Sequence, residues 1–206
     1  KVIPRISATV TGATWGSQGR TLDGDDFMTL PAAFNTSVAS HDEGTVIFWV
    51  KPTTLTAATI YSIFGCGGAN VAEPAAFSPH FRSVAGTYYF SFLQKIEGNA
   101  TYNLPRGNTS ITVNNWYCCA ISSNGTNWFM EVNSIAQTLS FTLGSDTGNW
   151  FSDSNPATPT SYIGANQFDG SRIEYFTGVI GEGIISYPML SLSKRNDFYN
   201  STRGRY

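Results

Sequence analysis

Short runs of β-branched and aromatic residues, separated by glycine and other turn residues, recur along the whole chain. Runs of this length and spacing are typical of antiparallel β-sheets, and helical periodicity is scarce. The runs expected to form strands are residues 46–50, 60–64, 88–93, 111–113, 116–122, 128–132, 161–164 and 176–187. This pattern predicts an all-β sandwich or barrel.

Turn and capping signals indicate where several elements end. The Asn124-Gly125 pair lies between two of the expected strands and is a strong hairpin signal. Gly65 and the glycines after it are expected to end the strand that precedes them. Only the C-terminal end departs from the strand pattern, because Ser191 is a candidate N-cap for a short helix.

The charge of the chain and the length of its apolar runs each argue against one class of partner. The formal net charge is -2, and the richest basic cluster is Arg203-Gly204-Arg205, so we expect no nucleic acid partner. The apolar runs are far shorter than the roughly 20 residues of a bilayer-spanning helix, so we expect no membrane insertion.

A chain of 206 residues can enclose one large core, and we expect a single domain over residues 1–206.

The three cysteines do not suggest a disulfide framework. Cys118 and Cys119 are adjacent, and neighbouring side chains on a strand point to opposite faces. One bridge from Cys66 is sterically possible, but no cysteine or histidine pair has zinc spacing. We expect all three to be buried small hydrophobes in a protein assembled in a reducing cytosol.

Several motifs, in order along the chain, carry a resemblance to a known family. They lie at residues 12–15, 19–31, 44–52, 115–122, 128–134, 161–164 and 176–187. Together they resemble concanavalin A-like, laminin-G-like jelly-roll domains. The resemblance implies a sandwich of two antiparallel sheets with a short C-terminal helix, and it assigns Trp15, Trp49 and Trp116 to the core. Ser134 stands where the family has glycine, so we expect a less tight turn there.

The C-terminal residues are similar to those of a smaller group within these domains. Residues 190–206 are similar to the end of laminin-G-like domains found in tailed-phage virion proteins. This implies a non-catalytic virion surface protein, assembled in the host cytoplasm, that is either a capsid decoration or a tail-fibre adhesion module. Its partners would be host surface glycans or other virion proteins. We expect a homo-oligomer, such as a trimer, or many copies per particle.

Two alternatives remain from other functional classes. A glycan-active jelly-roll enzyme would need converging carboxylates, for which Glu131, Glu182 and Asp169 are the candidates. His41 and His80 lie in expected loops and suggest no catalytic centre, so no catalytic residue is assigned. A secreted, extracellular lectin-like domain of a cellular organism would carry glycans on its Asn-x-Ser/Thr sites.

Exposed aromatic residues are the expected glycan ligands. The longest predicted loop, residues 144–160, contains Trp150 and Phe151 beside Asp153, although the role slightly favoured for these two rings is an anchor that plugs the end of the sandwich. The tyrosines on or near the middle strands are further candidates, namely Tyr88, Tyr89 and Tyr102.

Calcium is the one metal that the sequence suggests. The segment Asp23-Gly24-Asp25-Asp26 clusters carboxylates, which are suitable Ca²⁺ ligands, and Asp25 and Asp26 are the candidates if loop carbonyls join them. The alternative is an Asp-Gly turn in which the side chains bond nearby N–H groups. No cofactor is expected to be required.

Overall fold

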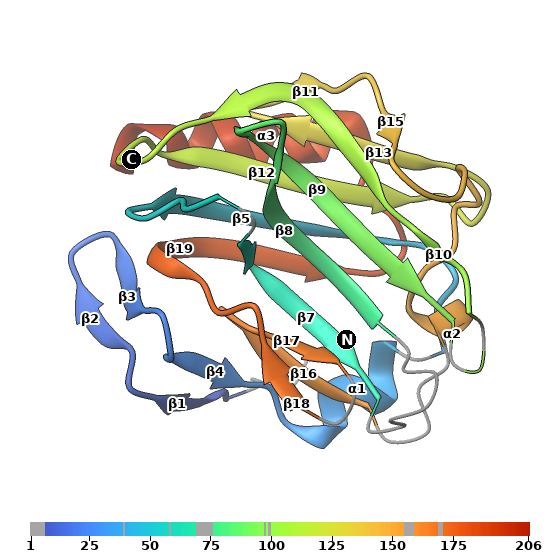
Figure 1. The fold of residues 1–206 in the computed structure, drawn as a ribbon, viewed down its shortest axis with the longest axis horizontal. Coiled ribbons are helices and arrows are strands. Elements are labelled where there is room, and N and C mark those ends of the chain that lie inside the picture. Colours follow the sequence, from blue (N-terminus) through green and yellow to red (C-terminus); the bar gives the residue numbers. More distant parts are fainter. Residues whose placement is uncertain are drawn as a thin grey trace.

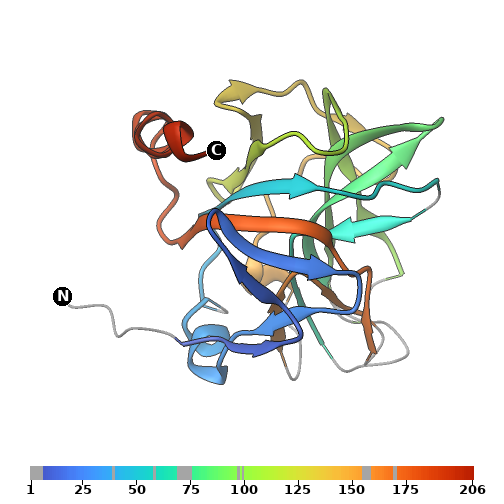
Figure 2. The same ribbon diagram turned by 90° about the vertical axis from the view of Figure 1, so that its left-hand side faces the viewer.

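The computed structural model describes residues 7–38, 40–57, 59–68, 76–96, 98, 100–154, 159–168 and 171–206. Two antiparallel sheets lie face to face and enclose the hydrophobic core, as Figure 1 and Figure 2 show. A helix follows the last strand and lies outside the sandwich. This arrangement confirms the predicted all-β sandwich with a short C-terminal helix.

The strands fall into two large sheets and one separate hairpin. The ten-stranded sheet has the order β1 (Thr9–Thr11), β4 (Phe27–Thr29), β16 (Thr160–Ile163), β7 (Phe64–Gly67), β8 (Ala76–Val84), β9 (Thr87–Lys95), β11 (Pro105–Ile111) and β15 (Ser140–Phe141). In the same sheet, β6 (Ile60–Ser62) pairs with β8, and β10 (Tyr102–Asn103) pairs with β9. The seven-stranded sheet has the order β14 (Ile135–Ala136), β13 (Trp128–Val132), β12 (Tyr117–Ser123), β5 (Gly44–Pro52), β19 (Thr177–Ser186), β3 (Gly19–Asp23) and β2 (Thr14–Gly16). The separate hairpin pairs β17 (Asn166–Phe168) with β18 (Ser171–Ile173).

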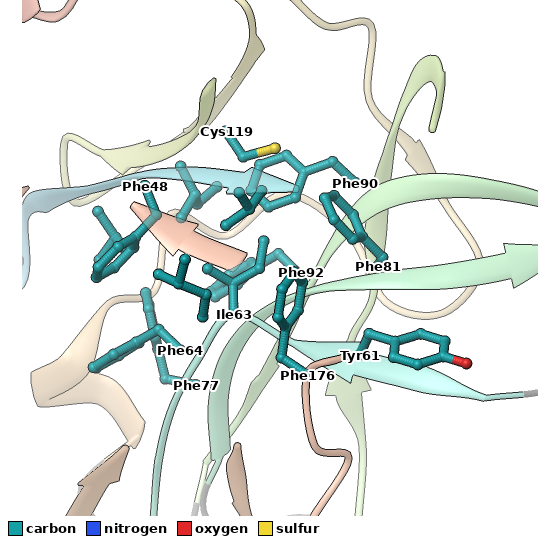
Figure 3. Packing of buried hydrophobic residues seen from close by; sticks show 14 of the residues in the cluster. Phe48, Tyr61, Ile63, Phe64, Phe77, Phe81, Phe90, Phe92, Cys119 and Phe176 are labelled. Carbon is teal, nitrogen blue, oxygen red and sulfur yellow. The ribbon is translucent and has the colours of Figure 1, made fainter. Parts of the chain in front are cut away.

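The core forms because the strands alternate between their two faces. Val46, Phe48 and Val50 of β5 belong to the main core cluster. Figure 3 shows the phenylalanine side chains that pack together in this cluster, which come mostly from β7, β8 and β9. The three cysteines are free and buried, as predicted. Burial raises the pKa of the Cys66 thiol to about 11, so it stays protonated and behaves as an apolar group.

The C-terminal helix covers the outer face of the seven-stranded sheet. Helix α3 (Leu192–Thr202) begins at the predicted cap, where the Ser191 hydroxyl accepts a hydrogen bond from the Lys194 N–H. Trp49 lies beneath it, stacked on Tyr199 at 5.5 Å and on Tyr206 at 4.7 Å between ring centroids. The Trp49 indole also donates to Thr202 at 2.7 Å. Trp49 is therefore buried under α3 and does not fill the interior between the sheets.

Two further tryptophans differ from the prediction that they are core residues. Trp15 is 76% exposed because it lies on β2, the edge strand of its sheet. Trp116 is half-buried, and its ring centroid lies 4.6 Å from that of Tyr206. Both rings therefore lie outside the core that the sheets enclose.

One expected strand is divided and another is displaced. Residues 60–64 form the end of β6 and the start of β7, interrupted at Ile63, and β7 continues through Gly67. The interruption lies opposite Pro79 of β8, which accepts from the Ile63 N–H but has no N–H to donate in return. Residues 111–113 hold only the last residue of β11, which begins at Pro105.

The two turns at the ends of β13 have different forms. The predicted hairpin joins β12 and β13, with the Asn124 N–H bonded to the Asn127 carbonyl across the loop. At the other end, Asn133 and Ser134 form a tight turn with φ of 53° and 65°, so the expectation of a looser turn is wrong. The Asn133 side chain holds it by accepting from the Cys118 N–H at 2.8 Å.

Two short helices were not expected from the sequence. Helix α1 (Ala32–Val38) buries Phe34 and Val38, which lie one turn apart. Helix α2 (Phe151–Ser154) lies inside the segment predicted to be a loop. In the described part of the chain, every helix is too short to span a membrane.

Candidate functional site

The structure places the predicted aromatic loop in the core. Trp150 is 1% exposed and Phe151 is 4% exposed, and the Phe151 ring stacks on Phe77 at 4.2 Å between centroids. Asp153 closes the first turn of α2 by accepting the Trp150 N–H at 2.7 Å. Trp150 and Phe151 therefore anchor the end of the sandwich, and neither ring is exposed enough to stack on a sugar. Burial of two large apolar rings outweighs the polarity of the surrounding loop.

The candidate tyrosines divide between the two faces of the ten-stranded sheet. Tyr88 points into the core, where its hydroxyl donates to the Thr56 carbonyl. Tyr89, the next residue along β9, points the opposite way, to the outer face. Tyr102 on β10 is paired with Lys95 and is 37% exposed. The structure therefore brings Tyr89 and Tyr102, but not Tyr88, to the outer surface of this sheet.

That outer face carries mostly polar residues, with Leu93 among them, and we call it the polar face. It comprises Ser78, His80 and Arg82 of β8, Tyr89, Ser91 and Lys95 of β9, Tyr102 of β10 and Arg106 of β11. Strand register brings them together, because residues paired in an antiparallel sheet share a face. Arg82 pairs with Tyr89 in this way, and Arg106 pairs with Ser91.

Two cations of the polar face, Arg82 and Arg106, have no carboxylate partner among the described residues. The Arg106 guanidinium lies over the Tyr89 ring, 4.4 Å from its centroid. Arg82 has a buried Nη1 without a hydrogen-bond partner. Burial lowers the pKa of Arg82. The charge of Tyr102 raises this pKa and the charge of Arg106 lowers it, so the three side chains interact electrostatically. The ion pairs of the described residues join Arg195 to Glu131 and Arg205 to Glu182, so neither involves this face.

His80 adds an unpaired acceptor to the polar face. Its ring is 1% exposed, and burial lowers its pKa to about 4, so it is neutral near pH 7. Nδ1 lies 2.8 Å from the Ser78 carbonyl, which only accepts, so Nδ1 carries the proton. Nε2 is then an acceptor, and it has no partner. His80 lies within β8, which corrects the prediction of a loop position.

The hairpin of β17 and β18 borders the polar face. It lies against β7 and β8 (Figure 1). Glu174 ties it to the sheet by accepting from Asn166 at 2.9 Å and from Ser62 at 3.3 Å. Burial raises the pKa of the Glu174 carboxyl. Near the same hairpin, the Lys95 ammonium lies 5.8 Å from the centroid of the Phe168 ring.

Sequence reasoning missed most of the polar face because it missed β8. Phe77 and Phe81 alternate with Ser78, His80 and Arg82, which is the pattern of a strand with one buried face. Pro79 in the middle of the run obscured this signal, because proline is rare inside sheets.

The carboxylates considered for a glycan-active enzyme are dispersed. Glu131 is buried under α3 in its ion pair with Arg195, and Glu182 pairs with Arg205 near the C-terminus. Asp169 lies outside the described residues. His41 stacks on Tyr187, with 3.7 Å between ring centroids. The described members of this set therefore do not converge on one site.

The structure does bring the predicted calcium ligands together. The carboxylates of Asp23, Asp25 and Asp26 offer oxygen atoms that lie within 4.8 Å of one another. Asp26 also closes the turn, because its Oδ2 accepts the Asp23 N–H at 3.1 Å. A hydrogen bond with Asp23, followed by its charge, raises the pKa of Asp25. The turn that was the alternative interpretation is present, and calcium binding stays a prediction.

Comparison with solved structures identifies proteins of the same architecture. The CBM40 carbohydrate-binding module of the Ruminococcus gnavus IT-sialidase superimposes with a TM-score of 0.71 at 13% identity, covering 88% of this chain and 96% of the module. The chain shares its fold with carbohydrate-binding modules. Structures of the same module bound to α2,3 and α2,6 sialyllactose also match.

Two other matches come from multidomain enzymes. Domain 4 of the Geobacillus stearothermophilus arabinanase AbnA, in complex with arabinotriose, has a TM-score of 0.58 at 18% identity and covers 94% of this chain and 81% of that chain. The leech intramolecular trans-sialidase has a TM-score of 0.65 at 16% identity and covers 95% of this chain but 28% of its own. No protein-family model and no curated protein matches the sequence. At these identities the comparisons show a jelly-roll, lectin-like fold.

Proposed function

We propose that this chain is a non-catalytic glycan-binding module, and that its polar face binds a sugar with a carboxylate group. The observation that carries the proposal is the pair Arg82 and Arg106, two guanidinium groups on one sheet face without a carboxylate partner among the described residues. A guanidinium binds a carboxylate through two parallel hydrogen bonds.

The other groups of the polar face suit the remainder of a sugar. Tyr102 is partly exposed and presents both a ring and a hydroxyl beside the arginines. The shared fold with a module solved with sialyllactose, an acidic glycan, supports the same choice of ligand class.

Calorimetric titration with α2,3-sialyllactose, with lactose as the neutral control, tests the ligand class. We expect binding of sialyllactose and at least tenfold weaker binding of lactose. Arg82→Met and Arg106→Gln should each weaken sialyllactose binding by about tenfold or more, since each removes a charge-assisted hydrogen bond.

Arg203→Met provides the matched control, because Arg203 lies beyond α3 at the other sheet. It should leave the affinity unchanged. Equal affinity for sialyllactose and lactose would refute the acidic ligand. Unchanged binding in both polar-face variants would refute the location.

We also propose that the module serves adhesion on the virion surface of a tailed phage, in many copies or as a trimer. This proposal rests on the resemblance of residues 190–206 to phage virion domains. Antibodies against the domain, followed by electron microscopy, should decorate intact particles. Detection of the chain solely as free protein in the culture medium would instead support a secreted lectin-like domain.

A further inference from the structure

A cavity of about 640 Å³ opens where the two sheets separate at one edge of the sandwich. Figure 2 views the molecule from the side of the β2 and β3 strands that border it. Strand β3 pairs with β19 only as far as Ile180, opposite Arg20, and β19 continues alone on that side. The opposite wall comes from β1 and β4 of the other sheet, which contribute Val10 and Met28.

The interior of this cavity is apolar. Its lining includes Met28, Phe48, Ile163 and Ile180, which the strand pattern directs toward the space between the sheets. Gly183 allows the Phe48 ring to pack closely against β19 at this wall, because a Cβ there would lie 2.2 Å from the ring. The cavity is open to solvent at its rim. Its volume and lining are those of a small-molecule pocket.

The rim of the cavity places one aromatic ring beside one unneutralised cation. Trp15 is 76% exposed, and the Arg20 guanidinium lies 3.8 Å from its ring centroid. One Arg20 nitrogen donates to the Ala13 carbonyl at 3.3 Å. Arg205, the other cation of the lining, is paired with Glu182. Among the lining residues, Arg20 is therefore the cation that lacks a carboxylate partner in the described chain.

We propose that this cavity is a second binding site, which takes an amphipathic monoanion. The apolar body of the ligand lies between the sheets, against Met28, Phe48 and Ile163, and its carboxylate binds the Arg20 guanidinium at the rim. The site shares no residue with the polar face, so the proposal stands independently of glycan binding. One positive charge above an apolar pocket specifies both the single negative charge and the apolar body of the ligand.

Calorimetric titration of the whole chain with decanoate and with decanol separates the two parts of the proposal. We expect decanoate to bind more tightly than decanol. Arg20→Gln should weaken decanoate binding by about tenfold and leave decanol binding unchanged, because only the acid uses the charge.

A second pair of variants tests the location. Val10→Phe fills the cavity from its rim and should weaken both ligands at least tenfold. Val113→Phe is the matched control, since Val113 is 39% exposed, Val10 is 37% exposed and Val113 lies outside the cavity. It should leave both affinities unchanged. If Val10→Phe does not fold, as judged by circular dichroism, Ala8→Phe at the same rim replaces it.

Three results would overturn the proposal. One is the absence of binding of both ligands to the natural chain. Another is equal weakening of decanoate and decanol by Arg20→Gln, which would remove the role of the charge. The third is an equal effect of the Val10 and Val113 variants, which would place the binding elsewhere on the surface.

Discussion

Two arginines on the outer faces of the opposing sheets have very different surroundings. Arg195 of α3 lies over the seven-stranded sheet, where its Nε and Nη2 donate to Glu131 Oε1 at 3.1 Å and 2.7 Å. Its Nη1 donates to the Leu190 carbonyl. Arg82 of β8 lies on the ten-stranded sheet with a buried Nη1 that has no partner. Each nitrogen of the Arg195 guanidinium has a hydrogen-bond partner, whereas Nη1 of Arg82 has none among the described residues.

The surfaces around these arginines differ in the same way. Beneath α3 lies an apolar cluster of Ile47, Trp49, Cys118 and Ala120, which the helix covers. The polar face has serines, a histidine and cations in the corresponding position on the other sheet. In the described part of the chain, one face is therefore completed by the protein itself, and the other keeps a donor on Arg82 and an acceptor on His80 without partners. The following predictions test this difference, beginning with the largest expected effect.

Breaking the covered ion pair should cost the most stability. Glu131→Ala leaves the Arg195 charge buried without its partner, so we expect a loss of about 3–5 kcal/mol in the free energy of unfolding. Urea denaturation measures it. Glu182→Ala breaks the exposed pair with Arg205 and should cost less than about 1 kcal/mol. Equal losses in both variants would contradict the distinction between the covered and the exposed pair.

The polar face should make stability depend on pH through His80. Its pKa is about 4 in the folded chain and about 6.5 when unfolded, so the unfolded state binds the proton more readily. The contribution, about 3 kcal/mol, is complete above pH 6.5 and is lost as the pH falls toward 4. Urea denaturation between pH 7 and pH 4 should show this slope, and His80→Gln should reduce it.

Glu174 should change the pH dependence of stability in the direction opposite to His80. Burial raises the pKa of its carboxyl, so its contribution is lost as the pH rises above its ordinary value. The two groups therefore contribute to the pH dependence of stability with opposite sign. A slope that is the same in the natural chain and in His80→Gln would rule out the buried neutral histidine.

A smaller effect is expected where α3 bonds to the sheet. Thr202→Val removes the hydroxyl that accepts the buried Trp49 indole N–H and leaves that donor unsatisfied. We expect a loss of about 1–3 kcal/mol in the free energy of unfolding. Thermal denaturation checks it, with Ser201→Val as an exposed control on the same helix. A control that loses as much stability as Thr202→Val would contradict the role of the indole bond.

The smallest change in stability is expected at Arg82. Arg82→Met removes a guanidinium whose buried Nη1 has no hydrogen-bond partner among the described residues, so the free energy of unfolding should change by no more than about 0.5 kcal/mol. The same variant should lose affinity for acidic glycans, as proposed above. Urea denaturation of Arg82→Met beside Glu131→Ala compares the two faces directly. A destabilisation close to that of Glu131→Ala would show that Arg82 is a structural residue.

Local sequence patterns predicted the bounds of an element where the pattern lies within that element itself. The strand at Trp128–Val132 has the predicted bounds, and α3 begins after the predicted Ser191 cap. Both depend on periodicity and on a cap within a few residues, which are properties of the sequence itself. The same local signals predicted an all-β sandwich or barrel and the buried cysteines, and the resemblance to jelly-roll domains implied the two antiparallel sheets.

The environment of single side chains depended on the tertiary structure. Trp15 and Trp150 have the same side chain, yet the first is exposed at a sheet edge and the second is buried at the end of the sandwich. Burial depends on which distant strands pack around a residue, and local sequence does not record those contacts. Tyr102 reached the polar face only because β10 pairs with β9.

The sequence alone therefore determined the class of fold, because the alternation of apolar runs and turns is written in consecutive residues. The tertiary structure decided which residues share a surface. Arg82 and Arg106 are 24 positions apart, and only the pairing of β8, β9 and β11 brings them onto one face. Strand register is set by the packing of the whole core, so the polar face follows from long-range contacts.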